Sequence, residues 1–311
     1  MIRVGNIEKS YGEQKALKGI SLEVDKGELF GLIGPDGAGK TTLMRILVTL
    51  LLPDKGVASL DGLDVVADFR KIRKIVGYMP GRFSLYPDLT VAENLQFFAT
   101  VFGGTVEANY HLIKDIYSQI EPFKNRLAGK LSGGMKQKLA LSCALIHAPK
   151  VLILDEPTTG VDAVSRKEFW EMLNNLRHKG ITILVSTPYM DEANLCDRVA
   201  LLQNGSILSI DTPAKITASF TKKLLGVKVM NTSQRFGCVN LLRELNGIES
   251  VFSFGDSIHV TCGNSGMNEK TVLEYLQGHG QTDVSVDIIP ASIEDVFMEL
   301  MQDNGQSKPF S

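Results

Sequence analysis

Apolar and polar residues alternate over the first 30 positions of the chain, as in IRVGNIEKSY and ALKGISLEVDKGELF. This period of two predicts half-buried strands, and the glycines that interrupt it predict turns. The next segment, ELFGLIG (28–34), is largely apolar and runs into a glycine-rich turn, which predicts a buried strand. A helix is expected from Lys40 to Leu52, because Pro53 follows it and stops it.

Residues 89–148 follow two short strand patterns, VASLDG and IVGYMP, and change to helical periodicity. Strand patterns return at KVLILDEP (150–157) and ITILVST (181–187), and the helical segment between them ends at Gly180. Strand, helix and strand at this spacing predict parallel strands joined by crossover helices. The first part of the chain is therefore expected to have an α/β fold.

The pattern starts again after Pro213 and reads as β-α-β-β-α-β followed by one more helix. This order is typical of a ferredoxin-like α+β domain. We therefore predict two domains, with a boundary near residues 214–224. The first covers residues 1–214 and contains a helical region at about 82–148, and the second covers residues 225–311.

Composition narrows the functional classes. The 311 residues include 33 Lys and Arg against 35 Asp and Glu, so the net charge of −2 argues against a nucleic-acid binder that works by bulk electrostatics. The four cysteines show no metal-ligand spacing, and we expect free thiols in a reducing cytosol. No signal peptide and no apolar run long enough for a membrane span are recognised, so we expect the chain not to cross a membrane by itself.

The segment GPDGAGKT (34–41) follows an apolar strand, opens a helix and satisfies the phosphate-binding pattern GxxxxGK[ST]. Its glycines let backbone amides turn around phosphate oxygens, and the positive end of the helix dipole points to the same anion. Lys40 is expected to bridge the β- and γ-phosphates and Thr41 to ligate Mg²⁺. The predicted ATP-binding residues of this loop are Gly34, Pro35, Asp36, Gly37, Ala38, Gly39, Lys40, Thr41 and Thr42.

Two acidic residues end the apolar strand VLILDEP. Open α/β sheets bind ligands at the carboxyl ends of their strands, so Asp155 is expected to hold Mg²⁺ there, through water. Glu156 lies one residue further and is expected to polarise the attacking water as the catalytic residue.

LSGGMKQK (131–138), GPDGAGKTT and LILDEPTTGVD occur in this order and together resemble the ATP-binding cassette (ABC) family over about residues 1–215. The resemblance implies a P-loop NTPase core with N-terminal antiparallel strands and a helical subdomain, and it implies ATP and Mg²⁺ as ligands. It also implies that two subunits meet head to tail, so that the signature segment of one caps the ATP of the other. The signature residues are Ser132, Gly133, Gly134 and Gln137.

Further roles follow only from the resemblance. Tyr11 matches the aromatic residue that stacks on adenine, and Asp162 matches the aspartate that couples the two sites. PASIEDVFMEL near the end of the chain, Asp36, and RFSLYPDLTVAENL resemble the drug- and antibiotic-exporter branch. Two positions depart from the family pattern, because Gly81 replaces a glutamine and Pro188 replaces a histidine.

The leading hypothesis is thus an ATP-hydrolysing subunit of an export system that drives a separate membrane permease. It would act as a homodimer or as a heterodimer with a second cassette, peripherally on the cytoplasmic face of the membrane, with no nucleic-acid partner. Because Gly81 and Pro188 remove two groups that tune hydrolysis, a hydrolysis-poor regulatory subunit stays open as an alternative. A non-transport ABC ATPase is the other alternative.

Overall fold

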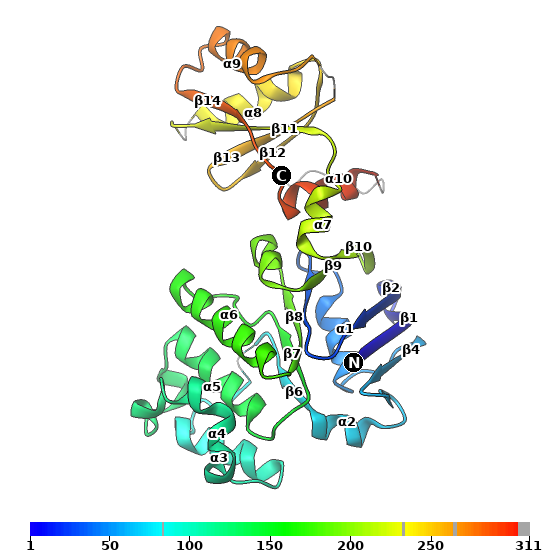
Figure 1. Cartoon of the computed structure of the whole chain (residues 1–311), viewed down its shortest axis with the longest axis vertical. Helices are drawn as coiled ribbons and strands as arrows, with labels where there is room; N and C mark the ends of the chain where they lie inside the picture. The colour runs from blue at the N-terminus through cyan, green and yellow to red at the C-terminus, as the bar shows by residue number, and fades with distance from the viewer. Residues whose placement is uncertain (83, 232–233, 264–265, 304–311) are drawn as a thin grey trace. The chain divides into compact units, whose positions relative to one another are not determined.

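The computed structural model describes residues 1–82, 84–231, 234–263 and 266–303. The chain forms two compact units, Met1–Pro213 with two sheets and Ala214–Ser311 with one, each with its own helices (Figure 1). No helix among the described residues is both long and apolar enough to cross a membrane. The four cysteines are buried free thiols, as expected, and burial raises the pKa of Cys143 far above its usual range.

A six-stranded sheet of order β10-β9-β3-β8-β7-β6 forms the centre of the first unit. Its parallel strands β3, β7 and β8 are buried at every position, as apolar runs covered on both faces should be. The predicted parallel α/β core is therefore confirmed. The strands of this sheet are β3 (Leu29–Ile33), β6 (Val76–Met79), β7 (Val151–Asp155), β8 (Thr182–Thr187), β9 (Arg198–Gln203) and β10 (Ser206–Asp211).

A second sheet of order β2-β1-β4-β5 is antiparallel and packs its apolar face towards the first helix. Ile7, Leu17 and Leu43 are fully buried in the core cluster that the two sheets share with this helix. The alternation at the start of the sequence thus marks real half-buried strands. The elements are β1 (Ile2–Tyr11), β2 (Gln14–Val24), α1 (Lys40–Leu47), β4 (Lys55–Leu60), β5 (Leu63–Asp64) and α2 (Phe69–Ile75).

The first helix is shorter than the sequence predicts. We expected it to reach Leu52, but α1 ends at Leu47 because Thr49 adopts a left-handed conformation with φ of 63°. The Arg73 guanidinium donates to the Thr49 carbonyl oxygen at 2.9 Å and to its hydroxyl at 2.8 Å, and so holds this turn. Pro53 alone therefore does not decide where the helix ends.

The helical region lies together in Figure 1 and begins with a capping box, in which Thr90 and Glu93 cap each other's backbone amides. The side-chain oxygen of buried Asn94 accepts the Tyr86 backbone amide, and its side-chain nitrogen donates to the Tyr86 carbonyl oxygen. The helical prediction for this region is confirmed. Its helices are α3 (Val91–Val101), α4 (Val106–Tyr117) and α5 (Gly133–Leu145), with α6 (Ala163–His178) following β7 and 3-10 turns at Glu121–Phe123, Ala128–Lys130 and Met190–Leu195.

The second unit has an antiparallel sheet of order β12-β13-β11-β14, which is the expected ferredoxin-like arrangement. Val227, Leu242 and Leu276 are fully buried in a core cluster formed by strands and helices of this unit. His259 of β13 hydrogen-bonds Asp295 of the last helix at 2.7 Å. The elements are α7 (Pro213–Ala218), β11 (Lys223–Val229), α8 (Arg235–Glu244), β12 (Ile248–Phe254), β13 (Ser257–Cys262), α9 (Glu269–Gly278), β14 (Val284–Ile288) and α10 (Ile293–Asp303).

Because the core cluster of the second unit contains only its own residues, we predict that a chain ending at Ala218 still folds and binds nucleotide. Its affinity for a fluorescent ATP analogue should stay within about threefold of the full chain, since the phosphate-binding loop lies in the first unit. Fluorescence titration and thermal melting measure the two properties. An unfolded truncated chain would show that the first unit depends on the second.

Candidate nucleotide site

The loop from Gly34 to Gly39 joins β3 to α1 and has a conformation that requires glycine. Gly37 and Gly39 have φ of 78° and 107°, where L-residues are strained. A Cβ atom at Gly34 would lie 2.2 Å from the Leu202 carbonyl oxygen, so neighbouring β9 also excludes a side chain. The loop therefore turns its amides around one point at the amino end of α1, as the motif predicts.

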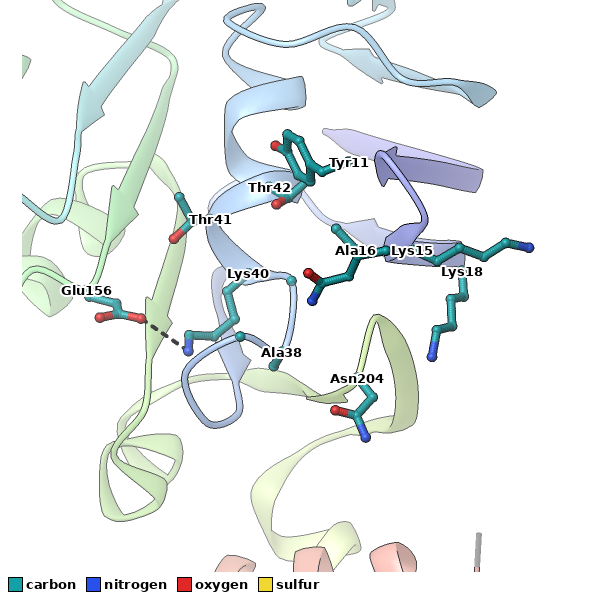
Figure 2. A pocket seen from close by; sticks show the side chains of 13 residues that line it. Tyr11, Lys15, Ala16, Lys18, Ala38, Lys40, Thr41, Thr42, Glu156 and Asn204 are labelled. Atoms are coloured by element: carbon teal, nitrogen blue, oxygen red, sulfur yellow. Dashed lines mark ion pairs between the residues drawn. The ribbon is translucent and has the colours of Figure 1, made fainter. Parts of the chain in front are cut away.

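A pocket of about 500 Å³ opens over this loop and is shown in Figure 2. Gly37 to Thr42 line it from the loop and α1, and Glu156 lines it from the loop after β7. Tyr11, at the end of β1, lines the same pocket with 49% of its surface exposed. The structure thus brings Tyr11, Lys40, Thr41 and Glu156, which are distant in sequence, to one cavity.

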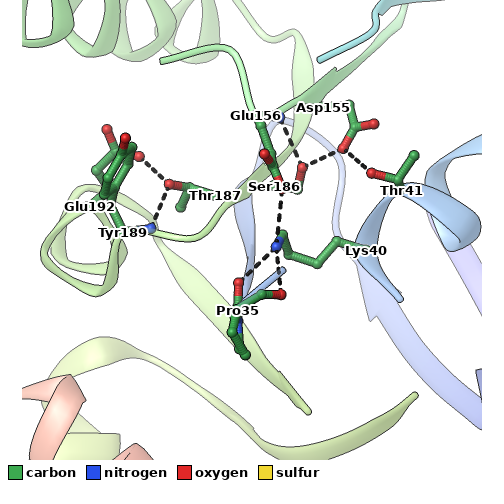
Figure 3. Close-up of polar contacts among 10 residues, drawn as sticks. Pro35, Lys40, Thr41, Asp155, Glu156, Ser186, Thr187, Tyr189 and Glu192 are labelled. Atoms are coloured by element: carbon green, nitrogen blue, oxygen red, sulfur yellow. Dashed lines mark hydrogen bonds and ion pairs between the residues drawn. The ribbon is translucent and has the colours of Figure 1, made fainter. Parts of the chain in front are cut away.

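Lys40 is almost fully buried, and its ammonium group donates two hydrogen bonds and forms one ion pair (Figure 3). Its Nζ donates to the carbonyl oxygens of Gly34 at 2.7 Å and Pro35 at 3.0 Å, and lies 3.1 Å from Glu156 Oε1. The two residues predicted to act on the terminal phosphate and on water therefore form an ion pair across the pocket.

Thr41 and Asp155 form the second polar contact, because the Thr41 hydroxyl donates to Asp155 Oδ1 at 3.0 Å. Asp155 ends β7 and is only 3% exposed. A hydroxyl and a carboxylate oxygen are hard ligands, which are the kind that Mg²⁺ prefers, so this donor set fits the predicted Mg²⁺ site.

The signature residues lie elsewhere in the chain. Ser132 caps α5, and its hydroxyl accepts the Met135 amide at 3.4 Å. None of the four signature residues, all of which the structure describes, lines the pocket over the phosphate-binding loop. Gly133 and Gln137 instead line a smaller cavity of about 170 Å³ together with Gly81 and Glu156.

Asp162 caps α6 and accepts hydrogen bonds from the amides of Val164 at 3.1 Å and Ser165 at 3.0 Å. The Ser165 backbone amide, followed by its side chain, lowers the pKa of Asp162 below the usual value. The residue is thus a charged helix cap in the single chain, and its role between two subunits stays a prediction.

Comparison with known proteins identifies the family. A family model described as "ABC transporter" matches residues 17–159. The "Nod factor export ATP-binding protein I" of Burkholderia pseudomallei is 35% identical over 304 residues, which cover 94% of each chain. This chain belongs to the ABC transporter family.

The chain is also similar to a second curated relative and to a solved ABC cassette. The "Probable multidrug ABC transporter ATP-binding protein YbhF" of Escherichia coli is 37% identical over 99% of this chain, but the chain spans only 53% of that protein. The dimeric cassette MJ0796, solved in a post-hydrolysis state bound to ADP and Pi, is 27% identical with a TM-score of 0.62. That match covers 68% of this chain and 98% of MJ0796, and it confirms an ABC ATPase fold for the first unit.

Both departures from the ABC pattern lie at the carboxyl edge of the parallel sheet, where β7 ends at Asp155 and Glu156 follows. A Cβ atom at Gly81 would lie 3.0 Å from the Asp155 carbonyl oxygen and 3.8 Å from Glu156 Cβ. A glutamine at position 81 would therefore require a small local shift. Pro188 follows the end of β8 and its side chain has no hydrogen-bonding group.

Sequence analysis did not identify three buried hydroxyl residues at the carboxyl ends of β7 and β8, which are Thr158, Ser186 and Thr187. Buried Glu192 accepts hydrogen bonds from Thr187 at 2.5 Å and from Thr158 at 3.1 Å. Ser186, the residue before Thr187, instead contacts Asp155 and Glu156. The available signal was the pair of hydroxyl residues at the end of an apolar strand in ITILVST.

Proposed function

We propose that this chain binds and hydrolyses ATP as the energy-coupling subunit of an export system with a separate membrane permease. The observation that carries the proposal is the pocket in which Lys40 faces Glu156, together with the hydrogen bond from Thr41, which also lines it, to Asp155. The export direction is supported by the names of the relatives, which include multidrug and Nod factor export proteins. Because the chain spans about half of YbhF, the activity of the complete system is part of the proposal.

Each group in the pocket has a distinct role. The amides of the Gly34–Gly39 loop and the Lys40 ammonium bind phosphate oxygens, and Tyr11 stacks on adenine. Thr41 and Asp155 would hold Mg²⁺, which neutralises phosphate charge when bound. Glu156 accepts a proton from the attacking water as general base. To bind phosphate, Lys40 must exchange its contact with Glu156, which leaves that carboxylate available to the water.

We propose further that the ATP-bound form is a head-to-tail dimer, supported by exposed Ser132 and Gly133 at the amino end of α5. This end can accept an anion from outside the chain. The pocket of one subunit and the signature of its partner would then enclose one ATP. MJ0796, which shares the fold, was solved as a dimer.

Ser132→Arg tests this arrangement. Nucleotide affinity of the monomer should stay within about threefold of wild type, whereas ATP-dependent dimerisation should be lost, because the long side chain occupies the phosphate-facing surface of α5. Light scattering of Glu156→Gln protein with ATP, with and without the substitution, measures the mass. Ser118→Arg, at the exposed carboxyl end of α4, is the control and should dimerise. A normal ATP-dependent dimer of Ser132→Arg would contradict the head-to-tail arrangement.

An apolar groove of about 440 Å³ is proposed as the docking site of the permease. Leu50, Phe98, Val101 and Phe102 line it. Leu50 and Val101 are each 60% exposed, and Phe102 is 40% exposed. Met79, Ser84 and Ala140 line both this groove and the small cavity that Glu156 lines. An apolar permease segment that binds in this groove would therefore contact residues that also line the small cavity beside Glu156.

Val101→Glu tests the groove with a candidate permease, chosen from the membrane proteins of the same genome that co-purify with this chain, as the partner. We expect stimulation of ATP hydrolysis by that protein in liposomes to fall at least about tenfold, because a charge cannot be buried against an apolar segment without cost. ATP affinity should not change. Val57→Glu is the matched control, since Val57 is 66% exposed on β4 outside the groove. Equal loss in both variants would contradict docking at the groove.

The same proposal places the chain peripherally on the cytoplasmic face of a membrane, as a homodimer or a heterodimer with a second cassette. The comparisons favour this function over a hydrolysis-poor regulatory subunit and over a non-transport ABC ATPase. Phosphate release by the purified chain with Mg²⁺ and ATP tests hydrolysis directly.

A further inference from the structure

Ser186 lies at the carboxyl end of β8 and is fully buried. Its hydroxyl donates to Asp155 Oδ1 at 2.8 Å and accepts the Glu156 amide at 3.0 Å (Figure 3). One hydroxyl therefore contacts both the carboxylate of Asp155, which fits Mg²⁺, and the backbone amide of Glu156, the proposed general base. In the described chain Asp155 Oδ1 also accepts the Thr41 hydroxyl, so Ser186 belongs to one continuous hydrogen-bond network with the phosphate-binding loop.

The backbone of Glu156 needs this support. Its φ is 49°, in the left-handed region that residues with a Cβ atom rarely adopt. The Glu156 amide donates both to the Ser186 hydroxyl and to the Ser186 carbonyl oxygen at 3.1 Å. This conformation turns the chain sharply after β7 and directs the Glu156 carboxylate towards Lys40.

Thr187 shows that the contact is specific to one face of the strand. Successive side chains of a strand point to opposite faces, and the Thr187 hydroxyl contacts Glu192 instead of Asp155 and Glu156. Both residues are fully buried and both use their hydroxyls. They therefore differ mainly in which carboxylate they contact, which makes Thr187 a matched internal control.

We propose that Ser186 is a positioning residue for ATP hydrolysis, which fixes the backbone of Glu156 and the orientation of the Asp155 carboxylate through one hydroxyl group. The inference rests on the proposed roles of Glu156 and Asp155 and adds a residue to them. Removing such a supporting contact around a metal or catalytic group typically lowers affinity or activity about 10- to 100-fold.

Ser186→Ala is the direct test, with steady-state hydrolysis of radiolabelled ATP at varied ATP concentration as the activity measurement. We expect kcat to fall about 10- to 100-fold, with the KM for ATP within about threefold of wild type. A binding measurement is independent of activity: the Mg²⁺ concentration that half-saturates the ATP-induced rise in melting temperature should increase, because Asp155 loses an orienting hydrogen bond. Ser186→Thr keeps the hydroxyl and should restore most of both properties.

Thr187→Val is the control for loss of a buried hydroxyl. It should lower the melting temperature at least as much as Ser186→Ala, while kcat changes less than about threefold. Ser186→Cys provides a second reading if Ser186→Ala does not fold, since the thiol is similar in shape but only a weak donor and acceptor. We expect the same direction of change for the cysteine variant.

Wild-type kcat and Mg²⁺ dependence in Ser186→Ala, or a loss of activity equal to that of Thr187→Val, would overturn the inference. Glu156→Gln measured beside these variants separates the two levels of the argument. If Glu156→Gln abolishes hydrolysis while Ser186→Ala does not lower it, only the positioning role fails. If Glu156→Gln hydrolyses ATP normally, the proposed catalytic role of Glu156 fails.

Discussion

Glu156→Gln should abolish ATP hydrolysis while leaving nucleotide binding intact. The amide side chain keeps the size of the carboxylate but does not accept a proton from water at neutral pH. Loss of a general base typically lowers a rate about 10²- to 10⁴-fold. Phosphate release in single-turnover experiments measures the rate, and a fluorescent nucleotide measures binding.

Nucleotide affinity in this variant is expected to stay equal or to increase. In the structure Glu156 Oε1 lies 3.1 Å from Lys40 Nζ, so the wild-type lysine must leave this anion to bind phosphate. A neutral amide at position 156 weakens that competition. Glu171→Gln, an exposed substitution on α6, is the control and should hydrolyse ATP as wild type does. Undiminished hydrolysis by Glu156→Gln would disprove the assignment of the base.

Lys40→Ala should abolish tight ATP binding. Lys40 is 3% exposed and is the cation at the centre of the phosphate-binding loop, so its loss leaves the phosphate charge without its main partner. Truncating one partner of a buried, hydrogen-bonded charge pair typically costs about 2–5 kcal/mol. That corresponds to roughly a 30-fold or greater increase in Kd for ATP. Fluorescence titration with Mg²⁺ and ATP measures it.

Lys18→Ala is the matched control for lysine removal. Lys18 lines the outer wall of the same pocket, on β2, and lies apart from Glu156 in Figure 2. Its removal should change the Kd much less than removal of Lys40. Lys40→Ala leaves the Glu156 carboxylate without its ion-pair partner, which could destabilise the fold. Lys40→Ala combined with Glu156→Gln removes this unpaired charge. If the double variant melts like wild type and still does not bind ATP, the loss of binding does not come from unfolding. An unchanged Kd in Lys40→Ala would contradict the phosphate-binding role.

The fold was largely predictable because its strands have strong local patterns. The buried runs LFGLI and VLILD are apolar at nearly every position, as strands covered on both faces must be. The phosphate-binding loop was predictable for another local reason: positive φ at Gly37 and Gly39 restricts those positions to glycine whatever surrounds them. Such features depend on a few consecutive residues.

The end of α1 was not predictable in this way. Its sequence continues with apolar residues to Leu52, yet the helix ends at Leu47 because Arg73, distant in sequence, binds the Thr49 turn. The short helix α2 that carries Arg73 was also missed. Tertiary contacts override helix propensity here because one turn of helix is worth little free energy by itself.

The sequence by itself determined the chemistry of this protein: a phosphate-binding loop, two carboxylates after a buried strand and a signature segment that matches the ABC family. Only the tertiary structure decided which of these groups meet. Strand β8 lies between β3 and β7 in the sheet, so Ser186 contacts Asp155 and Glu156 although about 30 residues separate them in the chain. The order of parallel strands depends on how the crossover helices pack, and the periodicity of one strand does not predict which strands lie beside it.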